Sequence, residues 1–164
     1  MPFRIMDTCI HPYGIEIDEA KNELYVSCQT SGHVEKYDLS NPNSKGEIVH
    51  QMDQPRDISL APKRDLIFIS DRYEKQVKVL KLSDPSIVVG ELKVRKPIGL
   101  VIDNDENRLF VGSATGHVKV FDISEEALNN RNFKEIGSIQ HKHLTHPAGM
   151  SIDDDLLFVV GQDS

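Results

Sequence analysis

The sequence predicts an all-β protein: a β-propeller of four-stranded antiparallel blades, with three complete blades and partial blades at both ends. The first observation is a motif that occurs four times, as HPYGIEID, QPRDISLA, KPIGLVID and HPAGMSID, with prolines at Pro12, Pro55, Pro97 and Pro147. The second is that each copy precedes another short apolar run, and three copies precede a third run and a weaker fourth. The third is that these runs are rich in Val, Ile, Leu, Phe and Tyr, which is typical of strands. A fixed period with one internal order indicates a repeat architecture, and radially repeated four-stranded units form a propeller.

The expected elements divide a single domain, residues 1–164, into five parts. Residues 3–10 are expected to form the outer strand of a preceding or closing blade. Residues 146–164 are expected to supply the first two strands of a further blade. A helical turn is predicted where SEEALNNRNF begins at Ser124. The three complete blades are predicted over residues 11–53, 54–95 and 96–145.

The apolar pattern within a unit matches a strand that is covered by neighbouring blades. LYVSC and LFVGS are apolar on both faces, which is typical of a strand buried on both sides. Gly14, Gly99 and Gly149 occupy the same place in the first strand of their units, where backbones are expected to converge. Asp57 occupies that place in the second unit and departs from this pattern.

The two best-matched units are HPYGIEID…NELYVS…GHVEKYDLS and KPIGLVID…NRLFVGS…GHVKVFDIS. They resemble the NHL and YVTN-type propeller repeats, and the resemblance covers nearly the whole chain. It implies the propeller fold. Function has to be argued from a site, because such folds host unrelated activities.

The number of units raises the question of how a ring is completed. Propellers have about 4 to 8 blades, and an open arc of three would expose apolar faces and unpaired edges. We therefore expect either a segment of a longer propeller chain or two copies that join to close a ring as a homodimer. The residues leave both interpretations open.

Composition excludes some classes of function. The net charge of −7 argues against nucleic-acid binding, because phosphate contacts need a basic surface. No apolar run approaches the roughly 20 residues of a membrane span, and no secretory signal is recognisable. Cys9 and Cys28 are expected to form neither a disulfide framework nor a metal motif. A cytoplasmic protein is the expectation that follows.

Positive and imidazole side chains gather on one predicted rim, formed by the loops before the first and third strands of each unit. The opposite rim collects acids, an asymmetry that can orient a partner. With no Gly-x-Ser-x-Gly, P-loop, His-Glu-x-x-His or CxxC motif, we expect a non-catalytic scaffold that binds a protein partner and needs no cofactor. The rim residues expected to bind are His33, Arg56, Arg72, Lys96, His117 and His146.

The alternative function is enzymatic, because some propeller lactonases and lyases hold a metal at the channel mouth. In this hypothesis zinc is bound near HKHLTH by His11, His141, His143 and His146. Lys96 takes the position equivalent to His11 and would oppose a cation, so solvated loop histidines are the simpler interpretation. Calcium is the second metal alternative, at DNDEN, residues 103–107. That stretch lacks the glycine and distal glutamate of an EF-hand loop, and a hairpin turn explains it more simply.

Overall fold

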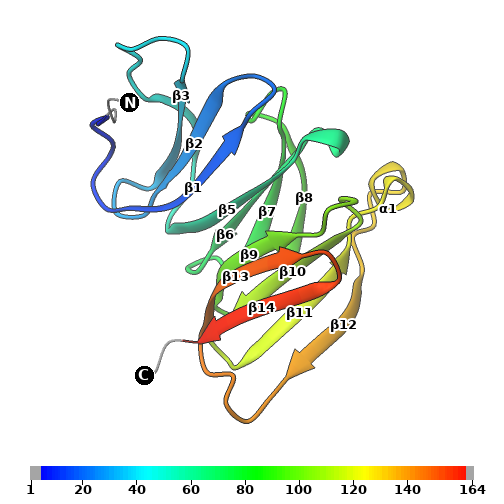
Figure 1. Ribbon diagram of the computed structural model, residues 1–164. Helices are drawn as coiled ribbons and strands as arrows, with labels where there is room; N and C mark the ends of the chain where they lie inside the picture. The colour runs from blue at the N-terminus through cyan, green and yellow to red at the C-terminus, as the bar shows by residue number, and fades with distance from the viewer. Residues whose placement is uncertain (1–4, 162–164) are drawn as a thin grey trace.

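The computed structural model describes residues 5–161 and contains three four-stranded antiparallel sheets and one two-stranded sheet (Figure 1). The first sheet holds β1 (Pro12–Asp18), β2 (Glu23–Cys28), β3 (His33–Asp38) and β4 (Glu47–Gln51). The second holds β5 (Pro55–Ala61), β6 (Leu66–Asp71), β7 (Gln76–Lys81) and β8 (Val88–Lys93). The third holds β9 (Pro97–Ile102), β10 (Arg108–Ser113), β11 (His117–Asp122) and β12 (Glu135–Gln140). The last sheet pairs β13 (Pro147–Asp153) with β14 (Leu156–Gly161).

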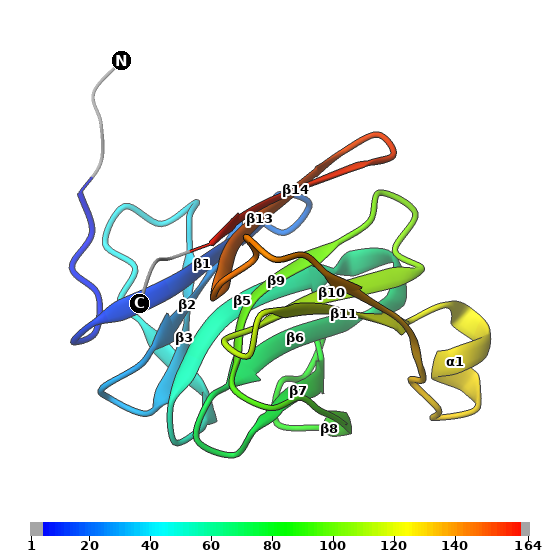
Figure 2. The same cartoon turned by 90° about the horizontal axis from the view of Figure 1, so that it is seen from below.

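The sheets follow one another in chain order, with strands paired in sequence order inside each sheet. We call the first strand of each sheet its inner strand. The inner strands of successive sheets lie side by side, β1 with β5, β5 with β9 and β9 with β13, as Figures 1 and 2 show. This arrangement confirms the predicted all-β propeller of four-stranded blades.

Two short helices interrupt the strands: a 3-10 turn over Pro62–Arg64 and α1 over Glu125–Asn129. The Ser124 side chain caps α1 by accepting a hydrogen bond from the Ala127 N–H. The helical turn predicted after Ser124 is therefore present. Within residues 5–161, no helix has the length and apolar character that crossing a membrane requires.

The segment before the first sheet differs from the expected outer strand. Residues 5–10 form no strand, while residues 3 and 4 lie outside the described part of the chain. An outer strand needs a third strand to pair with, and within residues 5–161 no third strand lies beside this segment. The segment lies instead against the first sheet, where Met6 and Cys9 pack on Leu24 and Tyr37. Its place in a closing blade stays a prediction.

The apolar core lies between successive sheets. One cluster joins Tyr25 of the first sheet to Ile58 of the second. The next joins Phe68 to Leu100, and a third joins Phe110 to Met150 of the last sheet. Each sheet is thus held mainly by the sheets before and after it.

Polar contacts add to this packing at the first two junctions, where the second strand of a sheet, which we call its middle strand, meets the inner strand of the next sheet. The Ser70 hydroxyl of β6 donates to the Ile98 carbonyl of β9 at 2.8 Å. The Ser27 hydroxyl of β2 donates in the same way to the Arg56 carbonyl of β5. The Asp57 carboxylate accepts a hydrogen bond from the Leu100 N–H at 2.7 Å. This bond explains why an acid stands where the other units have glycine, because the carboxylate joins the second sheet to the third.

Backbone hydrogen bonds place the loops on two rims. On one rim, the loop that follows the middle strand of a sheet is hydrogen-bonded to the segment that precedes the inner strand of the same sheet. The Gln29 N–H donates to the His11 carbonyl in this way, and the Ala114 N–H donates to the Lys96 carbonyl. On the other rim the Leu39 N–H donates to the Asn22 carbonyl. We call the first of these the histidine rim. It comprises residues 10–11, 29–32, 52–54, 72–75, 94–96, 114–116 and 141–146, together with Arg56 and the first residue of each following strand.

Candidate functional site

Cys9 and Cys28 form a disulfide, with their Cα atoms 5.8 Å apart. The expectation that Cys9 and Cys28 form no disulfide framework is therefore wrong. Cys28 ends β2, and the Gln29 N–H bonds to the His11 carbonyl at 3.1 Å, which brings the two cysteine backbones together. The disulfide removes the argument from unpaired cysteines on which the expectation of a cytoplasmic setting partly rested.

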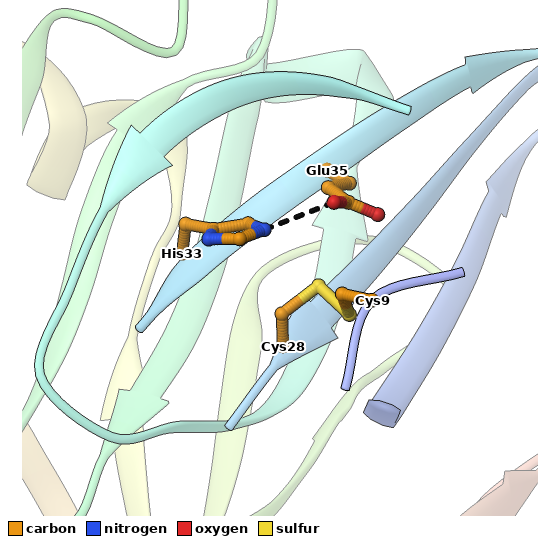
Figure 3. A group of neighbouring side chains, drawn as sticks. All are labelled: Cys9, Cys28, His33 and Glu35. Atoms are coloured by element: carbon orange, nitrogen blue, oxygen red, sulfur yellow. Dashed lines mark hydrogen bonds and ion pairs between the residues drawn. A yellow bond between two sulfur atoms is a disulfide. The ribbon is translucent and has the colours of Figure 1, made fainter. Parts of the chain in front are cut away.

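His33 and Glu35 lie beside this disulfide (Figure 3). They are two residues apart on β3, so their side chains project from the same face of the sheet. His33 Nε2 lies 2.9 Å from Glu35 Oε1, and Glu35 Oε2 accepts a hydrogen bond from the Tyr37 hydroxyl at 2.5 Å. One donor atom from each of Cys9, Cys28, His33 and Glu35 lies within 4.8 Å of the other three. These four residues form the Cys–His–Glu cluster.

The carboxyl group of Glu35 is held ionised by its partners. Burial acts to raise its pKa, but hydrogen bonds from Tyr37, His33 and the Cys9 backbone outweigh burial and lower the pKa below its ordinary value. The Cys9 N–H thus links the N-terminal segment to the same carboxylate. The cluster therefore holds a negatively charged oxygen next to two sulfur atoms and an imidazole.

The structure distributes the six expected rim residues unevenly. His33 is buried and belongs to the Cys–His–Glu cluster, so it is not presented on the rim surface. Arg56 stacks over the Tyr13 ring, its guanidinium carbon 4.9 Å from the ring centroid. Arg72, His117 and His146 are half-buried and Lys96 is exposed. A cavity of about 270 Å³ on this rim is lined by Asp53, Gln54 and Tyr73 rather than by the expected residues.

The four histidines of the alternative metal site do not converge. His11 Nδ1 bonds to the Thr30 hydroxyl at 2.6 Å, and the rings of His141 and His143 lie 5.3 Å apart between centroids. Within residues 5–161, the Cys–His–Glu cluster is the group of histidine, cysteine and acidic side chains close enough together to hold a metal ion. It contains none of these four histidines.

The acidic stretch at residues 103–107 forms a turn. Asp103 Oδ1 accepts hydrogen bonds from the Asn107 and Arg108 N–H groups at 2.7 and 2.9 Å, and Oδ2 pairs with the Arg108 guanidinium at 2.8 Å. Burial acts to raise the pKa of Asp103, but these bonds outweigh it and lower the pKa. The Asp103 carboxylate is thus engaged in local structure, as the hairpin interpretation predicts.

Two sheet faces at the ends of the described chain are apolar and exposed. On β1, Ile15 and Ile17 are 64% and 51% exposed. On β14, Phe158 and Val160 are 54% and 65% exposed. We call these the β1 face and the β14 face. The β1 face includes a groove of about 440 Å³ lined by Met6, Thr8, Pro12, Tyr13, Gly14, Ile15, Leu24 and Val26.

Residues at the same positions in the internal sheets are buried. Ile58 and Leu100 are the equivalents of Ile15, because all three occupy the same position in the pairing of the inner strand with the middle strand. The Ile58 and Leu100 side chains are 3% and 6% exposed. Phe158 corresponds in the same way to residues that are at most 8% exposed, namely Tyr25, Phe68 and Phe110. The two faces therefore expose side chains that the fold covers wherever another sheet follows.

Two carboxyl groups on inner strands, those of Glu16 and Asp57, have raised pKa values. Burial first, and the nearby Asp57 carboxylate second, raise the pKa of Glu16, and a hydrogen bond from the Leu60 N–H opposes this only in part. Burial likewise raises the pKa of Asp57 despite bonds from the Leu100 and Ile58 N–H groups. The folded protein thus carries two partly buried acids whose charged forms disfavour each other.

Replacing Glu16 by glutamine is expected to raise the free energy of unfolding at pH 7. Because the folded-state pKa of Glu16 is raised, the folded protein binds this proton more tightly than the unfolded chain, and stability is lost as the pH rises through that pKa. The advantage of Glu16→Gln should therefore shrink as the pH falls to about 4, near the ordinary pKa of glutamate. Urea unfolding of both proteins at pH 4 and 7 measures this. Glu19→Gln, at an exposed acid in the next turn, should show no such change between the two pH values.

No family model matches this chain, and no curated protein matches it. Solved structures do. A 6-phosphogluconolactonase candidate from Bacteroides uniformis superposes with a TM-score of 0.75 at 11% identity, over 92% of this chain and 47% of that chain. A chain of the nidogen/laminin complex gives 0.67 at 17% identity, over 87% and 52%. The computationally designed Ika8 protein gives 0.65 at 12% identity, over 90% and 42%. At these identities the likeness shows the propeller fold, and this chain spans about half or less of each of these proteins.

Proposed function

We propose that this chain is a non-catalytic propeller unit that binds protein, and that its first partner is a second copy, which closes the ring. The observation that carries the proposal is the exposure of Ile15 and Phe158 at positions whose equivalents are buried in the internal sheets. Large exposed apolar patches mark interaction sites on proteins. Covering them with a further propeller sheet repeats a contact that the chain already makes three times.

The two faces are complementary to each other. Inside the chain, an aromatic residue of each middle strand packs in one cluster with an aliphatic residue of the next inner strand. Phe158 of one copy would pack in this way on Ile15 of the other. Two copies then make two identical junctions and leave no open face, which is how a head-to-tail contact closes. The internal pairs are Tyr25 with Ile58, Phe68 with Leu100, and Phe110 with Met150.

The lengths of two of the similar structures support two copies. This chain covers 47% of the Bacteroides uniformis protein and 42% of designed Ika8 while superposing over nine-tenths of its own length. A propeller of that size needs about one further chain length of blades. A second copy supplies it with the same sheet-to-sheet contacts.

The closed ring would present the histidine rim twice. Arg56, Arg72, Lys96, His117 and His146 would then form the candidate surface for other proteins, consistent with an NHL or YVTN-type interaction scaffold. The net charge of −7 disfavours nucleic acid as the partner. The other hypothesis, a metal-dependent lactonase-like or lyase-like enzyme, has less support, because His11, His141, His143 and His146 do not converge.

Light scattering after size exclusion tests the proposal. We expect twice the 18.5 kDa mass of one chain across a range of protein concentrations. Phe158→Asp should reduce the mass to that of a single chain, because a buried carboxylate would replace the aromatic contact at both junctions. Circular dichroism should show that the variant keeps its strands, since the Phe158 side chain is exposed in the single chain.

Tyr73→Asp is the matched control. Tyr73 is 67% exposed and lies in a loop of the histidine rim, away from both faces, so this variant should keep the doubled mass. A wild-type protein with the mass of one chain would contradict the proposal. So would a continuous series of larger masses, which indicates open-ended association, or equal dissociation by both variants.

A further inference from the structure

The Cys–His–Glu cluster contains more ligand chemistry than a structural crosslink requires. We propose that, when the Cys9–Cys28 disulfide is reduced, Cys9, Cys28, His33 and Glu35 together bind one tetrahedral divalent cation of the zinc class. The disulfide and the metal site are alternative states of the same four side chains.

The distances fit such an ion. Zinc bonds to sulfur at about 2.3 Å and to nitrogen or oxygen at about 2.0 Å, so tetrahedral ligand atoms lie roughly 3.3–3.8 Å apart. One donor atom from each of the four residues already lies within 4.8 Å of the others. Reduction lets the two sulfur atoms separate. Cys9 can move to accommodate the ion because residues 5–10 are not paired into any sheet.

The surroundings of the ligands suit coordination. His33 Nε2 bonds to Glu35 Oε1 at 2.9 Å and faces the cluster, and His33 Nδ1 lies 3.2 Å from the Ser31 carbonyl. When the cation takes Nε2, the imidazole hydrogen resides on Nδ1 and is donated to that carbonyl. The Tyr37 hydroxyl holds the other oxygen of Glu35 at 2.5 Å and so orients Oε1 toward Nε2. Metal-bound histidines and carboxylates usually have such supporting hydrogen bonds.

The chemistry balances with an external thiol or phosphine as the reductant. The sulfur–sulfur bond accepts two electrons from the reductant, which is itself oxidised, and two protons convert the sulfur atoms to thiols. The cation then displaces both thiol protons to solvent and forms two metal–sulfur bonds, while neutral His33 and ionised Glu35 complete the coordination. In either state the N-terminal segment is held to the end of β2.

Cobalt(II) is the probe for the experiment. The protein is reduced with tris(2-carboxyethyl)phosphine, freed of the reductant under argon and titrated with cobalt. We expect saturation at one equivalent, with a thiolate-to-cobalt charge-transfer band and the visible bands of tetrahedral cobalt, all abolished by added zinc. The oxidised protein should show neither set of bands.

Variants assign the ligands. Cys9→Ser should remove most of the charge-transfer intensity. His33→Gln and Glu35→Gln should each weaken zinc binding, measured by competition with a chromogenic chelator, by about 100-fold or more, since loss of outer-shell partners alone costs 10–100-fold. The double variant His141→Gln/His143→Gln is the control and should bind as the wild type does.

Several results would overturn the proposal. One is reduced wild-type protein that gives no thiolate band, and another is binding that depends on His141 and His143. If reduction unfolds the chain, circular dichroism decides the matter, because zinc should then restore the strands in the wild type and fail to restore them in His33→Gln. Reduced protein that stays unfolded with zinc contradicts the site.

Discussion

Phe68→Ala is expected to lower the free energy of unfolding by about 3–5 kcal/mol, the usual cost of removing a buried phenylalanine side chain. Phe68 is fully buried and belongs to the largest core cluster. Its ring packs with Leu100 and Leu109 of the third sheet, so the cavity would open at the contact between the second and third sheets. Urea unfolding followed by circular dichroism measures the loss.

Tyr73→Ala is the control for this prediction, because its ring lies nearby in the chain but is 67% exposed. It should change the free energy of unfolding by less than about 0.5 kcal/mol. Equal effects from Phe68→Ala and Tyr73→Ala would mean that the second and third sheets are not packed together in solution.

Gly99→Ala is expected to cost about 3 kcal/mol or more, near the upper end of the usual penalty for overpacking. A Cβ atom on Gly99 would lie 2.0 Å from the Ala148 carbonyl oxygen. The backbone fixes the positions of both atoms, so neither can rotate away. The last sheet would have to move away from the third. Limited proteolysis should then cut within β13 and β14 earlier than in the wild type.

Gly149→Ala offers a matched comparison, because Gly149 has the equivalent place in the last sheet. A Cβ atom there meets only the Val160 side chain, at 2.7 Å, and that side chain is exposed and able to rotate. Both glycine variants are best measured in the Phe158→Asp background, so that self-association does not contribute. Comparable losses in the two variants would refute the close approach at Gly99.

The repeat pattern carried most of the information about the fold. Strands, their order and the helical turn after Ser124 could be predicted, because each run is short, apolar and bounded by turn residues. Residues 5–10 could not be placed in the same way, since an outer strand exists only where a neighbouring strand offers hydrogen bonds. Asp57 interrupted the glycine pattern because its role, a bond to the Leu100 N–H, lies in another unit.

The Cys–His–Glu cluster was missed for a different reason. The two cysteines are 19 residues apart, too far for a local metal motif, and His33 was interpreted as a surface residue. A signal was nevertheless present. Cys9 immediately precedes the histidine rim, Cys28 ends a strand on it, and His33 and Glu35 begin the next strand with one residue between them. Topology, rather than spacing in the sequence, brings these four residues together.

Within residues 5–161, each sheet contacts only its immediate neighbours, so the chain should behave as a linear array. In such an array the free energy of unfolding is the sum of one contribution from each sheet and one from each contact between neighbouring sheets. Units at the ends have one junction where internal units have two. Opening should therefore begin at the first and last sheets and spread inward, with the amide groups of β6 and β10 the last to exchange with solvent. A ring that closes removes the ends of such an array, and with them the places where opening begins.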